Sequence, residues 1–317
     1  MSDEQGDAPR HLPFVLGIIG DSGSGKSTVA RGVRELIGPE RVTTLELDDY
    51  HRYSRAERQE LGLTALNPMV HNLSLVQEHL NLLRAGRPVR NRSYDHTDGT
   101  FGPLRVLDPE EVVIVRGLLG FPTEELRAAY DLAAFLYPEP ELLFRWKLRR
   151  DTRSRGYSEA EVLKSIARHL VDSKIYVLPQ ADRADLVVRY EVAEWDAPDT
   201  DVRTTLTLRR AAADAVRTNG IAARLGEHGS VEDGEGGEVI VRIDSTLPQS
   251  VVDAWGQERF PDTYASAGYG TYQGDEDDDG RLVPLAFTQL LIADLAQKLR
   301  RPAEPAPEAA QGAEASV

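Results

Sequence analysis

A glycine-rich segment, GDSGSGKST at positions 20–28, is the part of the chain best suited to bind an anion. It fits the pattern G-x-x-x-x-G-K-[ST], in which backbone N–H groups of a tight turn and a helix N-terminus face phosphate oxygens. The pattern assigns Lys26 to the outer phosphates of a nucleotide and the Ser27 hydroxyl to a magnesium ion. The predicted nucleotide contacts are Gly20, Asp21, Ser22, Gly23, Ser24, Gly25, Lys26, Ser27 and Thr28.

A glycine-rich turn that binds no ligand is the alternative interpretation of this segment. The segment, however, directly follows an apolar run at 14–19 and opens an amphipathic stretch near Lys26. This order of strand, loop and helix is the context that a phosphate-binding loop (P-loop) requires. We therefore favour the P-loop.

The carboxylate of Asp48 follows the next apolar run, at 42–47. In open α/β sheets ligands bind outside the carboxyl ends of the strands, so Asp48 is expected to face the phosphates. There it could accept the proton of an attacking hydroxyl and, with Ser27, hold the metal. Asp48 could instead merely cap the following turn, as isolated Asp residues often do.

A basic segment, RWKLRRDTRSR at 145–155, lies within a predicted helix at 141–155. Its spacing places Lys147, Arg150, Asp151 and Arg155 on one polar face. Such a face could be a solvated, salt-bridged surface. Arg also offers a planar fork that matches phosphate, and the transfer of a phosphoryl group needs cationic donors. We favour a mobile lid that supplies charge to the transition state.

Composition narrows the class of protein. The 317 residues include 52 acids and 37 bases, so the net charge of −15 argues against nucleic acid or an anionic membrane as a partner. Cys is absent, which excludes disulfides and thiolate nucleophiles and suits a reducing compartment. The apolar run near the start is too short to span a bilayer. A cytoplasmic protein is expected.

The hydrophobic pattern predicts an α/β fold with a mainly parallel sheet flanked by helices, similar to P-loop NTPases. Short apolar runs predict strands at 14–19, 42–47, 112–115, 184–190, 203–208 and 239–243. Helical periodicity predicts helices from Lys26, at 73–83, 141–155, 158–167, in a segment up to 225, and at 285–299.

The chain divides into four predicted parts. Residues 1–12 and the Pro/Ala/Glu-rich residues 302–317 form disordered tails, 13–195 form the P-loop core, and 196–301 form an α+β C-terminal region. Within the last, 226–238 is expected to be flexible. The acidic run at 275–280 resembles a calcium loop, but Ala286 stands where the bidentate Glu is needed, which favours a solvated turn.

From about residue 15 to 189 the chain resembles the phosphoribulokinases, within the wider phosphoribulokinase/uridine kinase group of P-loop kinases. The resemblance lies in motifs that occur in order: GDSGSGKST, LDDYH followed by Arg55, TALNP at 64–68, YDHTDGTF at 94–101, KLRRDTRSRGYS at 147–158 and PQADRADLVVR. The ALNP and RGYS segments are similar to phosphoribulokinases and unlike uridine kinases.

The resemblance implies roles for residues that spacing alone does not assign. Asp48 corresponds to the base that deprotonates the C1 hydroxyl of ribulose 5-phosphate, and His51 and Arg55 match acceptor-binding positions. Tyr94 and His96 fall where the family contacts the sugar phosphate. The lid residues Lys147, Arg150, Asp151 and Arg155 would bind substrates and neutralise charge. Each histidine could also be an ordinary polar residue on the surface, or a core residue whose hydrogen bonds are satisfied. ATP as co-substrate, Mg²⁺ and a homo-oligomer are also implied.

One position departs from the family pattern. After the strand at 112–115 the family carries a Glu that helps to hold magnesium, and this chain has Arg116. Replacing a negative by a positive charge beside a metal reverses a favourable interaction. Either Arg116 contacts the nucleotide phosphates while Asp48 and Ser27 carry the metal, or catalysis is impaired.

The sequence therefore predicts an ATP-dependent kinase that converts D-ribulose 5-phosphate to D-ribulose 1,5-bisphosphate, with Lys26, Asp48, Arg150 and Asp151 in catalysis. A uridine kinase or another sugar or nucleoside kinase is the first alternative. A catalytically impaired homologue that only binds nucleotides is the second, and Arg116 is the residue that supports it.

Overall fold

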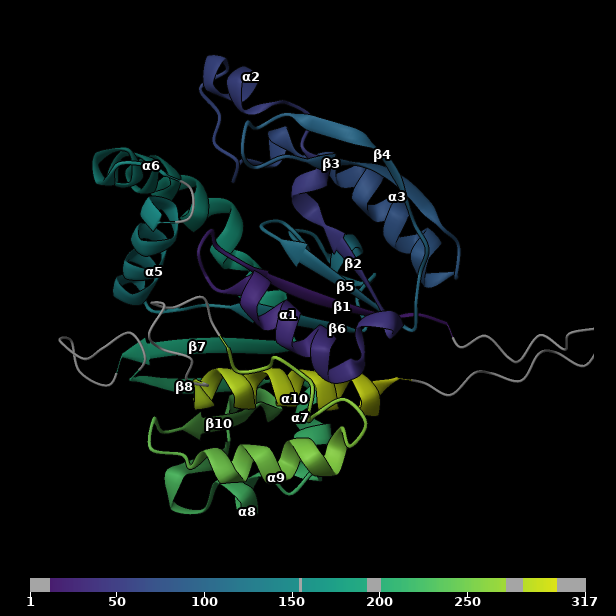
Figure 1. Cartoon of the computed structure of the whole chain (residues 1–317), viewed down its shortest axis with the longest axis vertical. Coiled ribbons are helices and arrows are strands. Elements are labelled where there is room, and N and C mark those ends of the chain that lie inside the picture. Colours follow the sequence, from purple (N-terminus) through teal and green to yellow (C-terminus); the bar gives the residue numbers. More distant parts are fainter. Residues whose placement is uncertain (1–11, 154–155, 193–200, 272–281, 301–317) are drawn as a thin grey trace, which may run out of the picture.

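The computed structural model describes residues 12–153, 156–192, 201–271 and 282–300 (Figure 1). Among them, eight strands form one sheet in the order β2-β5-β1-β6-β7-β8-β10-β9. Parallel pairs join β2 through β7, and antiparallel pairs join β7 through β9. The strands are β1 (Phe14–Gly20), β2 (Val42–Glu46), β5 (Val112–Gly117), β6 (Leu132–Leu136), β7 (Leu186–Val192), β8 (Val202–Leu208), β9 (Gly229–Asp233) and β10 (Val239–Ile243).

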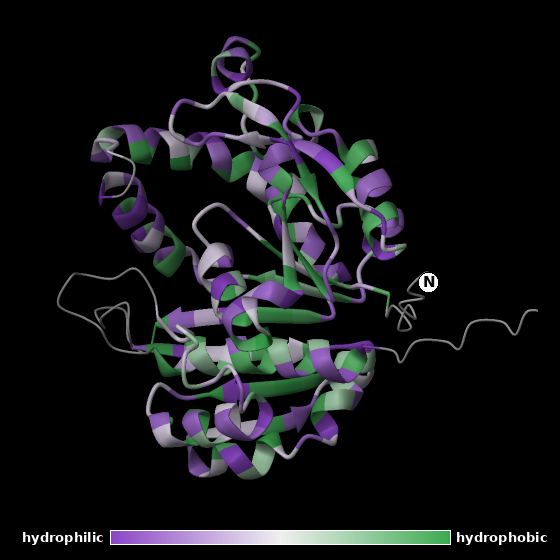
Figure 2. Ribbon diagram, turned by 45° about the vertical axis from the view of Figure 1, so that its right-hand side comes forward, coloured by the Kyte–Doolittle hydropathy of each residue, from purple (hydrophilic) through white to green (hydrophobic). Residues whose placement is uncertain are grey.

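The central strands are apolar on both faces, as expected for a parallel sheet covered on both sides. Phe14, Leu16 and Ile18 of β1 belong to one core, whereas Val15 and Ile19 belong to the other. Figure 2 shows the apolar strands running through the middle of the molecule. The prediction of a mainly parallel sheet flanked by helices is confirmed.

Helices cover both faces of the sheet. On the first face α1 (Lys26–Ile37) packs on α10 (Val283–Leu299), whose residues from Pro284 to Ala296 are all buried. On the other face lies α3 (Leu73–Arg84), which contributes to the second core. The remaining helices are α2 (Arg55–Glu60), α4 (Glu124–Arg127), α5 (Pro140–Arg153), α6 (Glu159–Asp172), α7 (Arg210–Arg217), α8 (Ile221–Leu225) and α9 (Gln249–Arg259).

The pattern of apolar residues located the other strands of the main sheet and the longer helices to within a few positions, and it missed β3, β4, β6, β9, α2, α4 and α9. A two-stranded sheet of β3 (Val89–Tyr94) and β4 (Phe101–Leu107) stands apart from the main sheet (Figure 1). Strand β6 was also not predicted. The expectation that 226–238 is flexible is wrong, because this stretch contains β9. This edge strand has no fully buried residue, so it left no hydrophobic signal.

Several predicted features fall outside the described residues. These are the tails apart from residue 12, the acidic run at 275–280, the last two residues of the predicted helix at 141–155, and with them Arg155. The C-terminal strands β8, β10 and β9 extend the same sheet that begins with β2. None of the described helices has the length and apolar character needed to cross a membrane.

Candidate active site

The P-loop occupies the turn between β1 and α1. Gly23 and Gly25 have φ values of 91° and 87°, which L side chains rarely adopt, and this explains why glycine is needed at both positions. The Lys26 ammonium donates to the carbonyl oxygens of Gly20 at 3.0 Å and Asp21 at 2.6 Å. The carbonyl oxygens of the loop therefore fix the position of the Lys26 ammonium.

Burial lowers the pKa of Lys26 to about 8, although the carboxylates of Asp21 and Asp48 oppose the change. Arg150 and Arg116 add to the lowering by charge repulsion. The hydroxyl oxygen of Ser24 is buried with no hydrogen-bond partner among the described residues. An anion in the loop would relieve the repulsion between these cations.

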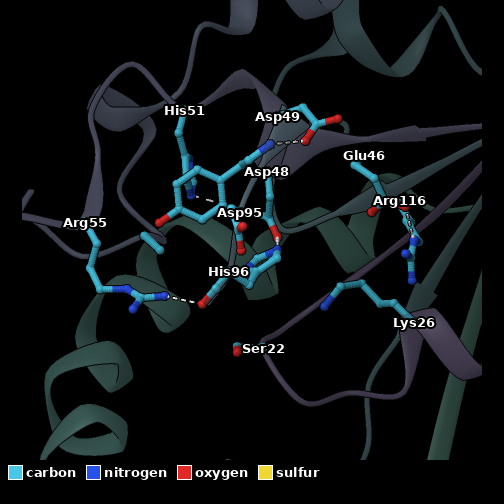
Figure 3. A network of polar contacts seen from close by, with 12 residues as sticks. Ser22, Lys26, Glu46, Asp48, Asp49, His51, Arg55, Asp95, His96 and Arg116 are labelled. Carbon is cyan, nitrogen blue, oxygen red and sulfur yellow. Dashed lines mark hydrogen bonds and ion pairs between the residues drawn. The ribbon is translucent and has the colours of Figure 1, made fainter. Parts of the chain in front are cut away.

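Asp48 lies in a short 3₁₀ turn, Leu47–Tyr50, directly after β2. Its carboxylate oxygens lie 3.3 Å from Nε2 of His96 and 4.0 Å from Nε2 of His51. Burial opposes its ionisation, but the hydrogen bond from His96 and the neighbouring imidazoles of His51, His96 and His71 outweigh burial, so the pKa of Asp48 lies well below its usual range. Asp48 is therefore an anion at neutral pH, and Figure 3 shows Lys26 extending toward it.

The neighbouring Asp49 holds the β3–β4 hairpin in place. Its buried carboxylate accepts a hydrogen bond from the backbone N–H of Tyr94 at 2.7 Å and forms an ion pair with Arg105. Both partners belong to the hairpin. Asp49 thereby positions Tyr94 and, two residues later, His96 over the turn that carries Asp48 (Figure 3).

His51 and Tyr94 form the buried wall of this region. The His51 ring lies 4.5 Å from the His71 ring and 5.0 Å from the Tyr94 ring, centroid to centroid. Burial and the charge of His71 lower the pKa of His51 to about 3, so it is neutral near pH 7. Its Nδ1 has no partner among the described residues. Arg58, which the motifs did not single out, is buried and donates to the Tyr94 hydroxyl at 2.8 Å.

Arg55 supports the hairpin turn that carries His96. Its guanidinium donates to the carbonyl oxygens of His96 at 2.5 Å and Thr97 at 3.3 Å, and its backbone N–H donates to Gly99 (Figure 3). Of the predicted acceptor residues, His51 and His96 thus lie beside Asp48. Tyr94 packs against both histidine rings, and Arg55 binds the backbone at His96.

The predicted lid residues Lys147, Arg150 and Asp151 lie on α5. Arg150 donates to the Ser22 hydroxyl of the P-loop at 3.3 Å and to Asp151 at 2.8 Å. Lys147 is buried, 3.3 Å from Nδ1 of His169 on α6. A Cβ at Gly23 would lie 3.1 Å from the Cβ of Lys147. Helix α5 therefore lies against the P-loop.

A magnesium ion fits these residues when a nucleotide supplies further ligands. No cluster of three or more metal-binding side chains occurs in the described parts of the chain. Mg²⁺ usually binds through one or two carboxylates, phosphate oxygens and water. The Ser27 hydroxyl and the ionised Asp48 are donors of the required kind, so both stay predictions for the metal.

The mainly parallel sheet and the phosphate-binding loop after β1 define the chain as a P-loop α/β protein. The sequence pattern of the phosphoribulokinase/uridine kinase family matches residues 15–194, and the chain belongs to this family. It is 35% identical to the phosphoribulokinase of Synechocystis sp. over 175 residues, which are 55% of this chain and 53% of that relative. It is 30% identical to the uridine kinase of Deinococcus deserti over 205 residues, 61% of this chain and 97% of that enzyme.

The phosphoribulokinase relatives match only part of the chain. The chain spans about half the length of the phosphoribulokinases that it matches. The solved phosphoribulokinase from Rhodobacter spheroides superimposes with a TM-score of 0.58 and 16% identity, over 81% of this chain and 99% of that one. At this identity the likeness concerns the fold, and the fold extends beyond the matched family segment.

Proposed function

We propose that the protein is an ATP-dependent kinase that phosphorylates D-ribulose 5-phosphate to D-ribulose 1,5-bisphosphate. The observation that carries the proposal is the ionised Asp48, which lies beside His51 and His96 and is close enough to Lys26 for its charge to oppose the lowering of that lysine's pKa. A P-loop with a carboxylate beside it, under a hairpin of polar side chains, is an arrangement suited to phosphoryl transfer.

In the proposed reaction the P-loop N–H groups and Lys26 hold the phosphates of ATP. Asp48 accepts the proton of the C1 hydroxyl, the resulting oxygen bonds to the γ-phosphorus, and the bond from that phosphorus to ADP breaks. Phosphoryl transfer passes through a loose transition state, so a carboxylate of low pKa suffices to orient the hydroxyl and takes its proton late. Mg²⁺, when bound, would neutralise charge on the phosphate oxygens.

The lid would complete the charge balance. Arg150 already contacts the P-loop through Ser22, and Asp151 accepts a hydrogen bond from it and fixes its orientation. Lys147 and Arg155 belong to the same predicted group. The cations Arg55 and Arg150 suit an acceptor that already carries phosphate, whereas a nucleoside needs stacking surfaces and donors to base edges. A homo-oligomer and a cytoplasmic location stay predictions.

A uridine kinase is the second candidate function, and the match to almost the whole length of the Deinococcus deserti uridine kinase favours it. The two candidates are separated by ADP release in the presence of ATP and Mg²⁺ with ribulose 5-phosphate, other pentose phosphates or uridine. We expect turnover with ribulose 5-phosphate and a product heavier by one phosphoryl group in mass spectrometry. Turnover with uridine alone would refute the substrate, and ATP binding without any product would support the impaired homologue.

A further inference from the structure

A cross-strand ion pair, Glu46 with Arg116, stands beside the P-loop and has no role in the reaction described above. Glu46 ends β2 and Arg116 is the penultimate residue of β5, and the two are register partners in the parallel sheet. Nε of Arg116 lies 2.5 Å from a carboxylate oxygen of Glu46. The sequence motifs singled out Arg116 and not Glu46.

The pair lies on the face of the sheet that α1 covers. Side chains alternate along a strand, so Arg116 shares a face with Val112 and Ile114, which pack in the same core as α1. Arg116 is the register partner of Ile18 on β1, two residues before the P-loop begins at Gly20. The guanidinium is therefore placed next to the first turn of α1, where Lys26 begins the helix (Figure 3).

The guanidinium retains binding capacity in this place. Nε is engaged by Glu46, and the two terminal nitrogens of Arg116 have no hydrogen-bond partner among the described residues. Its side chain is 28% exposed, so a ligand in the P-loop could reach it. Arg116 and Arg150 both repel the Lys26 ammonium, and a polyanion bound beside these cations would relieve that repulsion.

We propose that Arg116 binds the nucleotide phosphates directly and that Glu46 is the positioning residue that orients its guanidinium. The inference rests on the proposed function of the P-loop and adds two residues to it. Arginine supplies two parallel donors to phosphate, and Glu46 fixes the direction in which they point. Arg116 thereby provides part of the positive charge that a magnesium ion would otherwise have to supply, so ATP should bind with little dependence on the metal.

The test is calorimetric titration of the full chain with ATP, in EDTA and in MgCl₂. We expect Arg116→Gln to weaken binding about tenfold or more in EDTA, and less in magnesium, because a charge-assisted hydrogen bond is lost. Arg242→Gln is the matched control, since Arg242 forms a cross-strand pair with Glu232 at 2.7 Å in the distant β9–β10 pair. It should leave both affinities unchanged.

A double-mutant cycle isolates the positioning role of Glu46. Glu46→Gln should weaken binding in EDTA about threefold when Arg116 is present, and should not weaken it in the Arg116→Gln background. If Glu46→Gln acts only through the loss of its charge, it will change the ATP affinity by the same factor in both backgrounds. That result would refute the positioning role.

The exchanged pair, Glu46→Arg with Arg116→Glu, separates stability from binding. It keeps an ion pair, so the thermal midpoint should stay close to that of the wild type. Its guanidinium would stand one strand further from β1, about 4.8 Å away, so the affinity in EDTA should fall as in Arg116→Gln. Should Arg116→Gln not fold, Arg116→Lys and the exchanged pair carry the same test.

Two results would overturn the proposal. If Arg116→Gln, or the exchanged pair, binds ATP in EDTA as tightly as the wild type, the pair only joins two strands. In that case the proposed function stands, because the wild type still binds ATP. A wild type that binds no ATP under either condition would overturn the pair and the proposed function together.

Discussion

Ion pairs between Arg and a carboxylate occur in both halves of the sheet, but their surroundings differ. In the parallel half, Lys26, Asp48 and the Glu46–Arg116 pair gather at one edge and stay largely sheltered. In the antiparallel half, Arg242 with Glu232 and Arg217 with Asp233 lie on exposed surface, with side chains between 37% and 79% accessible.

Strand direction explains this difference. Parallel strands all end at the same edge, so the polar residues that follow them converge on one ligand. Antiparallel strands end at alternate edges, and their charged residues are dispersed. Exposed pairs of this kind contribute about 0–1 kcal/mol to stability. The comparison indicates that strand topology, rather than composition, decides whether an Arg–carboxylate pair lies beside the P-loop.

The largest effect is expected for Asp48→Asn. The amide cannot accept the proton of the acceptor hydroxyl, so kcat should fall about a hundredfold or more. ATP affinity should change little, because the P-loop N–H groups and Lys26 are intact. Steady-state kinetics and calorimetry on the same preparation check both statements. A variant with normal turnover would remove the chemical distinction between the two halves.

A smaller effect on the acceptor side is expected for Asp49→Asn. The asparagine keeps an acceptor for the Tyr94 N–H and loses the ion pair with Arg105. The hairpin should become less firmly placed, raising the KM for the acceptor about tenfold, with KM for ATP unchanged. The control is Arg242→Gln, which removes an ion pair from the antiparallel half. An equal change in both substrates' KM values would argue against a role of the hairpin in acceptor binding.

The pH dependence of ATP binding tests the site in the parallel half of the sheet. In the free protein the pKa of Lys26 is about 8, below the ordinary value, so the ammonium is lost as pH rises through 8. Bound phosphate favours the charged form and raises this pKa again. ATP affinity should therefore fall about fivefold between about pH 7 and about pH 9, with proton uptake on binding. Titrations in two buffers of different ionisation enthalpy measure this uptake, and Lys26→Arg should abolish it.

The junction between the halves should matter for stability more than for binding. Gln289 of α10 is fully buried, donates to the Thr28 carbonyl at 2.9 Å and accepts from the Gly270 N–H at 2.5 Å. Gln289→Ala leaves the Thr28 carbonyl and the Gly270 N–H without this hydrogen-bond partner, and it should lower the free energy of unfolding by about 2 kcal/mol. ATP affinity should change less than twofold. A large loss of ATP affinity would mean that the C-terminal helix shapes the nucleotide site.

The smallest effect is expected for Arg242→Gln. Both side chains of its pair are about half exposed, at 49% and 54%. Removing it should change the free energy of unfolding by less than about 0.5 kcal/mol and leave kinetic constants unchanged. Denaturant unfolding measures the difference. A cost of several kcal/mol would contradict the distinction drawn between sheltered and exposed pairs.

The sequence predicted those features that depend on residues close together in the chain. The P-loop was found because its glycines, lysine and hydroxyl are contiguous, and strand β10 was found at its observed bounds because its burial alternates strictly. Strand β9 was missed because it is held by pairing with β10 rather than by burial. The β3–β4 hairpin was missed because the β4 side chains are mostly exposed.

The sequence by itself determined the P-loop, the apolar strands and the place of Asp48 after one of them, since each depends on neighbours in the chain. The tertiary structure alone decided that Glu46 meets Arg116, that Asp49 holds the hairpin, and that His96 reaches Asp48. These contacts join residues 45 to 70 positions apart. They depend on sheet register and on the docking of a hairpin, which no spacing within a single segment records.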